Sequence, residues 1–157
     1  MSTTRVGQRL RRQVLSDAGG RCGYCRVSEE ITGAPLEIEH IVPEALDGPT
    51  DRANLWAVCR YCNLLKSDRV AAPDPATGAP TPLFNPREQH WAHHFAWIEG
   101  GRRIHGTTPT GRATVEALAL NRALLVRARG YWIAAGWRPP LNTTQRCSSS
   151  PVAYDEY

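Results

Sequence analysis

Four of the five cysteines in this 157-residue sequence stand in two Cys-x-x-Cys pairs, a spacing typical of metal ligands. Cys22 and Cys25 form the first pair, and Cys59 and Cys62 form the second. A two-residue gap lets both sulfurs of a pair reach one ion, and two pairs complete the tetrahedral shell that structural Zn²⁺ prefers. The odd cysteine count and the lack of an export signal argue against disulfides. The spacing therefore predicts a four-cysteine zinc site, with two separate thiol pairs or a redox motif as the alternative.

The segment between the two pairs carries groups suited to hydrolysis. It holds Glu39 and His40 and, further on, Asn54, while Asn63 directly follows the last cysteine of the second pair. Hydrolysis of a phosphodiester bond needs a base for water, an ion at the leaving oxygen and a frame that aligns them. Neutral imidazole suits the base because its unperturbed pKa of about 6.5 lies close to neutral pH. Carboxylate and amide oxygens suit Mg²⁺. Neighbouring residues on a strand point to opposite faces, so Glu39 can hold an ion on one side of a phosphate while His40 addresses the water on another.

The stretch from about Arg21 to Arg69 resembles the HNH (ββα-metal) endonuclease family, in which two short strands and a helix enclose one catalytic divalent ion. The resemblance lies in the following run of residues: Cys22-x-x-Cys25, Glu39-His40-Ile41-x-Pro43, Asn54 and Cys59-x-x-Cys62-Asn63-x-x-Lys66. The cysteine pairs and the central Glu-His-Ile-x-Pro run are jointly specific, and the stretch covers about a third of the chain. Residues 83–138 also look like the C-terminal extension of some bacterial HNH proteins, which brings no known role.

The resemblance implies roles for four residues. His40 would be the general base, and Glu39 would be a ligand of the catalytic metal, Mg²⁺ or Mn²⁺. Asn54 would brace the loop and orient the histidine, and Asn63 would be the second protein ligand, from the helix. Asn63 stands where many members of the family have histidine, and Glu39 stands where many have aspartate; both variants occur within the family.

Each of these residues also has a plain structural interpretation. His40 is alternatively a buried structural histidine or a zinc ligand. Glu37 lies two residues from Glu39 on the same face of the expected strand and is a rival carboxylate. Asn54 is alternatively only a turn former, and Asn63 an ordinary helix residue.

Positive charge is concentrated in two flanks around an acidic middle. Residues 1–26 carry six arginines and one acid, residues 27–101 carry five basic and eleven acidic groups, and residues 102–138 carry seven arginines and one acid. This pattern suits a site that holds divalent metal within surroundings that attract a polyanion. Codon bias is the alternative explanation, since all but one of the 19 basic residues are arginine. Arg60 and Lys66 are the expected nucleic-acid contacts, and a solvated helix face is the alternative for Lys66.

The elements that must position these groups form one expected α+β domain over residues 1–138. Its parts are an N-terminal basic helix (1–20), the HNH core with its zinc site (21–70), a Pro-rich connector (71–83) and a hairpin followed by two helices (84–138), with a disordered tail over 139–157. Within the core, residues 36–41 alternate apolar and charged side chains as a half-buried strand does. Residues 55–58 predict a second strand, and residues 60–70 a helix.

These observations lead to the hypothesis of an endonuclease that hydrolyses phosphodiester bonds in DNA with a divalent cation. RNA stays open as a substrate, as does the oligomeric state. The alternative is a non-catalytic zinc module that binds nucleic acid or protein, which explains the cysteines and the charge but not the order of Glu39, His40, Asn54 and Asn63. No apolar run approaches the ~20 residues needed to span a bilayer and the start lacks a secretory signal, so we expect a cytoplasmic protein without a membrane partner.

Overall fold

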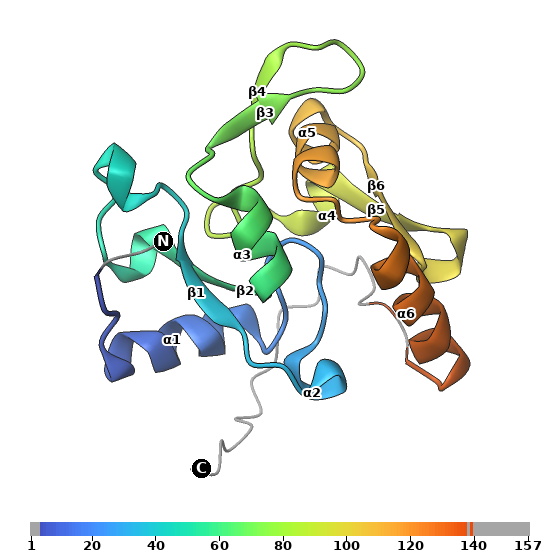
Figure 1. Ribbon diagram of the computed structural model, residues 1–157, viewed down its shortest axis with the longest axis horizontal. Helices are drawn as coiled ribbons and strands as arrows, with labels where there is room; N and C mark the ends of the chain where they lie inside the picture. The colour runs from blue at the N-terminus through green and yellow to red at the C-terminus, as the bar shows by residue number, and fades with distance from the viewer. Residues whose placement is uncertain (1–3, 138, 140–157) are drawn as a thin grey trace.

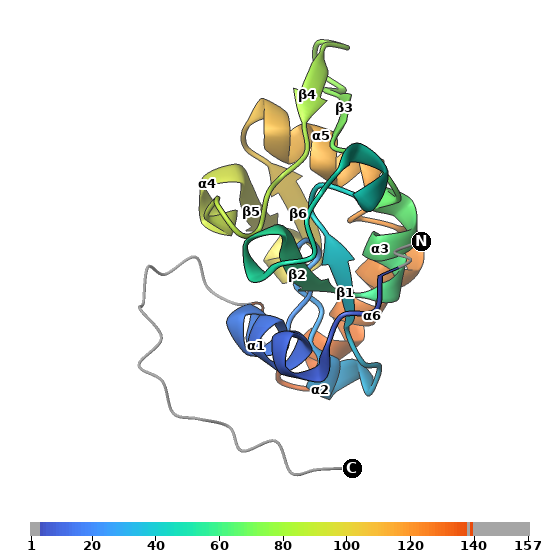
Figure 2. The ribbon, with the colours of Figure 1, turned by 90° about the vertical axis from the view of Figure 1, so that its left-hand side faces the viewer.

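The computed structural model describes residues 4–137 and 139, and in that part of the chain the strands form three separate antiparallel pairs with helices packed around them (Figure 1). The pairs are β1 with β2, β3 with β4 and β5 with β6, so each pair is a hairpin of strands adjacent in the sequence. Figure 2 shows α1 and α2 at one end of the molecule and the β3–β4 hairpin at the other. No helix among these residues is long and apolar enough to cross a membrane.

The centre of the molecule is a strand–strand–helix unit. β1 (Glu37–His40) pairs with β2 (Leu55–Val58), with Glu39 opposite Trp56 and His40 opposite Leu55. α3 (Arg60–Lys66) follows at once and packs against β1. The α+β class and the small ββα core expected from the sequence are therefore confirmed. The helix ends four residues before the expected residue 70 because Ser67 has a positive φ of 50°, which an α-helix does not accommodate.

Helix α1 (Gln8–Ala18) packs against both strands of this unit and buries Val14 and Ala18. It ends at Gly19, whose φ of 61° lies in the left-handed region that glycine adopts readily. Three short helical segments complete this half of the molecule: α2 (Glu29–Thr32), η1 (Glu44–Leu46) and η2 (Arg52–Asn54).

Residues 71–83, expected as an exposed connector, instead form a hairpin of β3 (Ala71–Pro73) and β4 (Pro80–Pro82). Pro73 lies opposite Pro80 in the register. Both strands of a two-stranded sheet are edges, so a proline there need not donate to a further strand. The four prolines that suggested a linker are thus compatible with a short ladder.

The remaining elements form the extension predicted as a hairpin and two helices. They are α4 (Trp91–His94), β5 (Phe95–Ile98), η3 (Glu99–Gly101), β6 (Arg103–Gly106), α5 (Pro109–Ala117) and α6 (Ala123–Ala134). Gly100 and Gly101 both have positive φ at the turn between β5 and β6, a conformation that glycine adopts at little cost. Thr108 caps α5 by accepting a hydrogen bond from the Gly111 amide, with proline at the first helical position.

One hydrophobic core joins the ββα unit to this extension. The first cysteine pair and Tyr24 are buried together with Phe84, Phe95 and Leu118. The guanidinium of Arg129, on α6, is buried as well and donates to the carbonyl oxygen of Cys25 at 3.3 Å. The extension therefore covers the cysteine-bearing turn directly.

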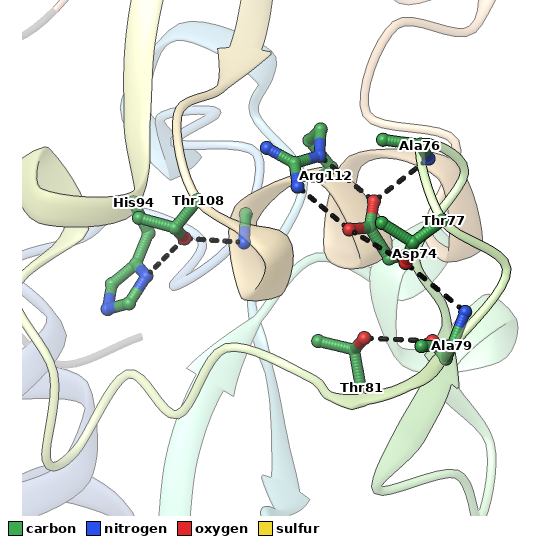
Figure 3. Close-up of polar contacts among 9 residues, drawn as sticks. Asp74, Ala76, Thr77, Ala79, Thr81, His94, Thr108 and Arg112 are labelled. Atoms are coloured by element: carbon green, nitrogen blue, oxygen red, sulfur yellow. Dashed lines mark hydrogen bonds and ion pairs between the residues drawn. The ribbon is translucent and has the colours of Figure 1, made fainter.

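A bidentate ion pair joins the β3–β4 hairpin to α5 (Figure 3). Arg112 donates from Nε and Nη2 to the two carboxylate oxygens of Asp74 at 2.9 and 2.8 Å. The Asp74 carboxylate also accepts the Ala76 amide of its own turn at 3.0 Å. Arg112, with help from this amide, lowers the pKa of Asp74 to about 2.

We expect Asp74→Asn to destabilise the protein at neutral pH but much less in acid. The folded-state pKa of Asp74 lies below its ordinary value, so the ionised carboxylate contributes fully above about pH 4, and this contribution is lost as the pH falls toward about 2. The measurement is the urea midpoint of both proteins across this pH range. Glu88→Gln, an exposed acid for which the described residues provide no ion pair, is the control. Equal midpoints of Asp74→Asn and the unchanged protein at pH 7 would contradict the role of this pair.

Candidate active site and metal centre

The four cysteines of the two pairs meet at one point. Their Sγ atoms all lie within 4.8 Å of one another, and the sulfurs of Cys25 and Cys59 are 3.7 Å apart. Cys22 and Cys25 come from the turn after α1, while Cys59 caps α3 and Cys62 lies in its first turn. Within the described residues this is the only cluster of its kind.

The dimensions of this cluster fit a tetrahedral ion. A regular tetrahedron with Zn–S bonds of about 2.3 Å has sulfurs about 3.8 Å apart. Hydrogen bonds from Cys22, Cys25 and Cys62 lower the pKa of Cys59 strongly, whereas the pKa values of Cys22 and Cys62 are raised, so Cys59 is the position that favours a thiolate, the form that binds metal. The structure thus indicates a metal site, as the spacing of the cysteines predicts.

A buried polar network links the first cysteine pair to the strand of the expected site. Tyr24, between Cys22 and Cys25, donates its hydroxyl to Oε1 of Glu39 at 2.5 Å. The ammonium of Lys66 lies 3.4 Å from Oε2 of the same carboxylate. Burial raises the pKa of Glu39, and the attraction of Lys66 opposes that shift. Both carboxylate oxygens therefore have a fixed partner.

Lys66 is not where the sequence analysis expected it. Its side chain is neither on a solvated helix face nor able to reach a phosphate, because only 1% of the residue is exposed. Its ammonium also donates to the carbonyl oxygens of His40 and Ile41 at 3.2 and 3.0 Å. Lys66 therefore holds the end of β1 from inside, and the expected nucleic-acid contact is corrected to an internal one.

His40 lies at the end of β1, outside the cysteine cluster and 7% exposed. Its Nε2 shares a hydrogen bond of 2.8 Å with the hydroxyl of Thr50, and Oε1 of Glu44 lies 4.0 Å from the same nitrogen. Nδ1 has no hydrogen-bond partner among residues 4–137 and 139. The ring is thus anchored through one nitrogen and free at the other.

Asn54 holds both ends of the loop that follows His40. Its side-chain oxygen accepts the Val42 amide at 2.9 Å, and its side-chain nitrogen donates to the carbonyl oxygens of Val42 and Pro49, each at 2.9 Å. The Asn54 side chain therefore fixes residues 42–49 relative to β2, and Thr50 lies at the end of that loop. The Asn54 side chain makes no hydrogen bond to the His40 imidazole.

Asn63 faces the same region from α3. Its amide nitrogen donates to Oε2 of Glu37 at 2.7 Å, so its amide oxygen is the atom left without a partner in the described chain. Oε1 of Glu37 accepts Arg60, whose side chain is 76% exposed. Arg60 therefore lies at the surface in the first turn of α3, as a residue expected to meet nucleic acid must.

An open hollow of about 280 Å³ lies between β1, η1 and α3. Glu39, His40 and Asn63 line it, whereas Glu37, Asn54 and Arg60 do not. Sequence reasoning missed the other polar residues of its wall and the anchor of His40, which are Glu44, Ser67, Asp68 and Thr50. No motif marks them, because a loop and a helix end bring them to the hollow.

Comparison with protein families agrees with this geometry. The family model described as HNH endonuclease matches residues 22–69, which run from the first cysteine to just beyond α3 and include β1 and β2. This segment, about a third of the chain, is therefore similar to the HNH core, and that family is nuclease in type, uses divalent metals and acts on nucleic acids. Searches of curated proteins and of solved structures gave no match to this chain.

Proposed function

We propose that this protein is an HNH endonuclease that hydrolyses phosphodiester bonds in DNA with a divalent cation, and that His40 is its general base. The observation that carries the proposal is the convergence of Glu39, His40 and Asn63 on one open hollow within the matched segment. A non-catalytic zinc module gives no reason for a carboxylate, an imidazole and an amide to line the same hollow.

His40 would take the proton of the attacking water through Nδ1. The hydrogen bond between Nε2 and Thr50 supports this assignment, because a proton on Nε2 that is donated to Thr50 leaves Nδ1 as the acceptor. As the water oxygen bonds to phosphorus, the bond to the leaving sugar oxygen breaks, and that oxygen takes a proton from solvent. Lys66 and Asn54 would hold the strand end and the loop so that the ring stays in place.

Glu39 and Asn63 would hold the catalytic cation, Mg²⁺ or Mn²⁺. An ionised carboxylate offers about four lone-pair sites, and Tyr24 and Lys66 occupy only two of those on Glu39. The free amide oxygen of Asn63 adds a second hard ligand on the same hollow. Such an ion, when bound, stabilises negative charge on the phosphate and the leaving oxygen.

The four cysteines would hold a structural Zn²⁺ that braces this site. Zinc binding can contribute on the order of 10 kcal/mol to a small fold. Through Tyr24, the turn that carries the first pair also positions Glu39. The two metals would thus have separate tasks, one in the fold and one in the reaction.

DNA is the proposed substrate because the arginine-rich flanks can hold its phosphates without reading bases. Binding of this kind weakens steeply as salt rises, since each neutralised phosphate releases counterions. RNA offers the same phosphates, so the assay below includes both.

We expect the protein to nick supercoiled plasmid DNA in the presence of Mg²⁺ or Mn²⁺, and His40→Ala to lower the rate by about 10²-fold or more, because general-base catalysis contributes at least that much. The measurement is conversion of plasmid with time, after zinc content and circular dichroism show that both proteins are folded. His105→Ala changes an exposed histidine on β6 and should leave the rate unchanged. Equal rates in all three proteins would point to a contaminant. No cleavage of plasmid or RNA by any of them would favour the binding module.

We expect Glu39→Gln to abolish cation-dependent cleavage and Glu37→Gln to retain most of it. The two carboxylates lie on the same face of β1, but only Glu39 lines the hollow. The comparison is made by plasmid cleavage over a Mn²⁺ titration and by direct Mn²⁺ binding in electron paramagnetic resonance. The opposite ranking would transfer the ligand role to Glu37.

We expect purified protein to contain about one zinc ion per chain and Cys62→Ser to lose it together with the fold, because one thiolate of a closed four-ligand shell is missing. Elemental analysis and thermal unfolding, with and without a chelator, measure both effects. Cys147→Ser, at a cysteine outside the described residues, is the matched control. Equal zinc content in the two variants would contradict a four-cysteine site.

A further inference from the structure

Helix α3 exposes two large apolar side chains beside the hollow. Tyr61 is 54% exposed and Leu64 is 61% exposed, and residues three apart on a helix lie on neighbouring parts of one face. Leu64 forms part of the wall of the hollow, together with Asn63 and Ser67. The exposed side of α3 therefore runs from the hollow across Leu64 to Tyr61.

The C-terminal extension brings a cation to this surface. Arg122 precedes α6, and its guanidinium carbon lies 4.4 Å from the centre of the Tyr61 ring. Arg60, largely exposed, is the residue next to Tyr61 on α3. Two arginines thus flank two exposed apolar side chains. Glu37 is the carboxylate paired with Arg60, and no described acid pairs with the Arg122 guanidinium.

We infer that Tyr61, Leu64 and Arg122 form a stacking surface for the nucleotide next to the scissile phosphate. The inference rests on the proposed function and assigns the extension a part in substrate binding. A base or sugar would pack on Tyr61 and Leu64, and Arg122 would pair with a phosphate of the same strand.

Charge and shape favour a nucleic-acid strand over a protein partner here. Every base has a π-face, so an aromatic ring beside arginines binds nucleotides without sequence preference. The apolar area is small and is bordered by cations, whereas stable protein interfaces bury a broad patch with an apolar centre. The position beside the hollow places such a nucleotide next to the phosphate that His40 would address.

The test is the affinity of His40→Ala protein, which binds without cleaving, for short fluorescent single-stranded and duplex DNA by fluorescence anisotropy. On this background we expect Tyr61→Ala to weaken binding about tenfold or more and Tyr61→Phe to keep it, because the ring supplies the stacking. Tyr131→Ala is the matched control, since Tyr131 is 69% exposed but lines a different hollow, between η3 and α6.

A salt titration separates the two components of the surface. Arg122→Gln should reduce the slope of log affinity against log salt by nearly one unit, about 0.7–0.9, because one phosphate contact is lost. Tyr61→Ala should leave that slope unchanged. Unchanged affinity in Tyr61→Ala, or an equal loss in Tyr131→Ala, would overturn the inference. Plasmid cleavage by the parent protein reports separately on the proposed function, which stands or fails independently of these affinities.

Discussion

The meeting of four cysteine sulfurs is the constraint on which the rest of the structure depends. It joins two segments 34 residues apart in the sequence, the turn after α1 and the start of α3. The chain between them, which includes β1, β2 and the loop held by Asn54, must therefore return to its starting point so that its two ends lie close together. A small sheet of two strands is marginal alone, so this closure is what makes a stable ββα unit possible.

Buried polar contacts link the cysteine cluster to the hollow that Glu39, His40 and Asn63 line. Tyr24 lies in the turn that carries the first cysteine pair, and its hydroxyl donates to Glu39, which lines the hollow. Lys66, one turn from the second cysteine pair, holds the other oxygen of Glu39 and the backbone of His40. A buried carboxylate with a buried ammonium is costly unless each group has partners, and here both have them. The cysteine cluster therefore helps to fix the positions of Glu39 and His40 through Tyr24 and Lys66.

The extension is part of this arrangement and not an appendage. Arg129 from α6 is buried against the carbonyl oxygen of Cys25, and loss of solvent lowers its pKa to about 10. Arg87 binds Asp17 of α1 at 2.8 Å and the carbonyl oxygen of Leu55 in β2 at 2.9 Å, and its guanidinium carbon lies 4.4 Å from the centre of the Trp56 ring. The C-terminal extension thus stabilises the ββα unit through Arg87 and Arg129, while Arg122 lies against Tyr61 on the exposed side of α3.

Local patterns in the sequence determined much of this protein. The Cys-x-x-Cys spacing predicted the metal site and the alternation around Ile38 predicted β1, because ligand spacing and strand period each depend on neighbours in the chain. Of the residues that the sequence singled out, Glu39, His40 and Asn63 line the hollow, whereas Asn54 does not. Only the tertiary structure decided that Lys66 is buried, that Thr50 anchors His40 and that Arg122 lies on Tyr61. Those contacts join residues whose separation in the sequence has no fixed relation to their distance in space, since loops and packed helices, not a repeating backbone geometry, bring them together.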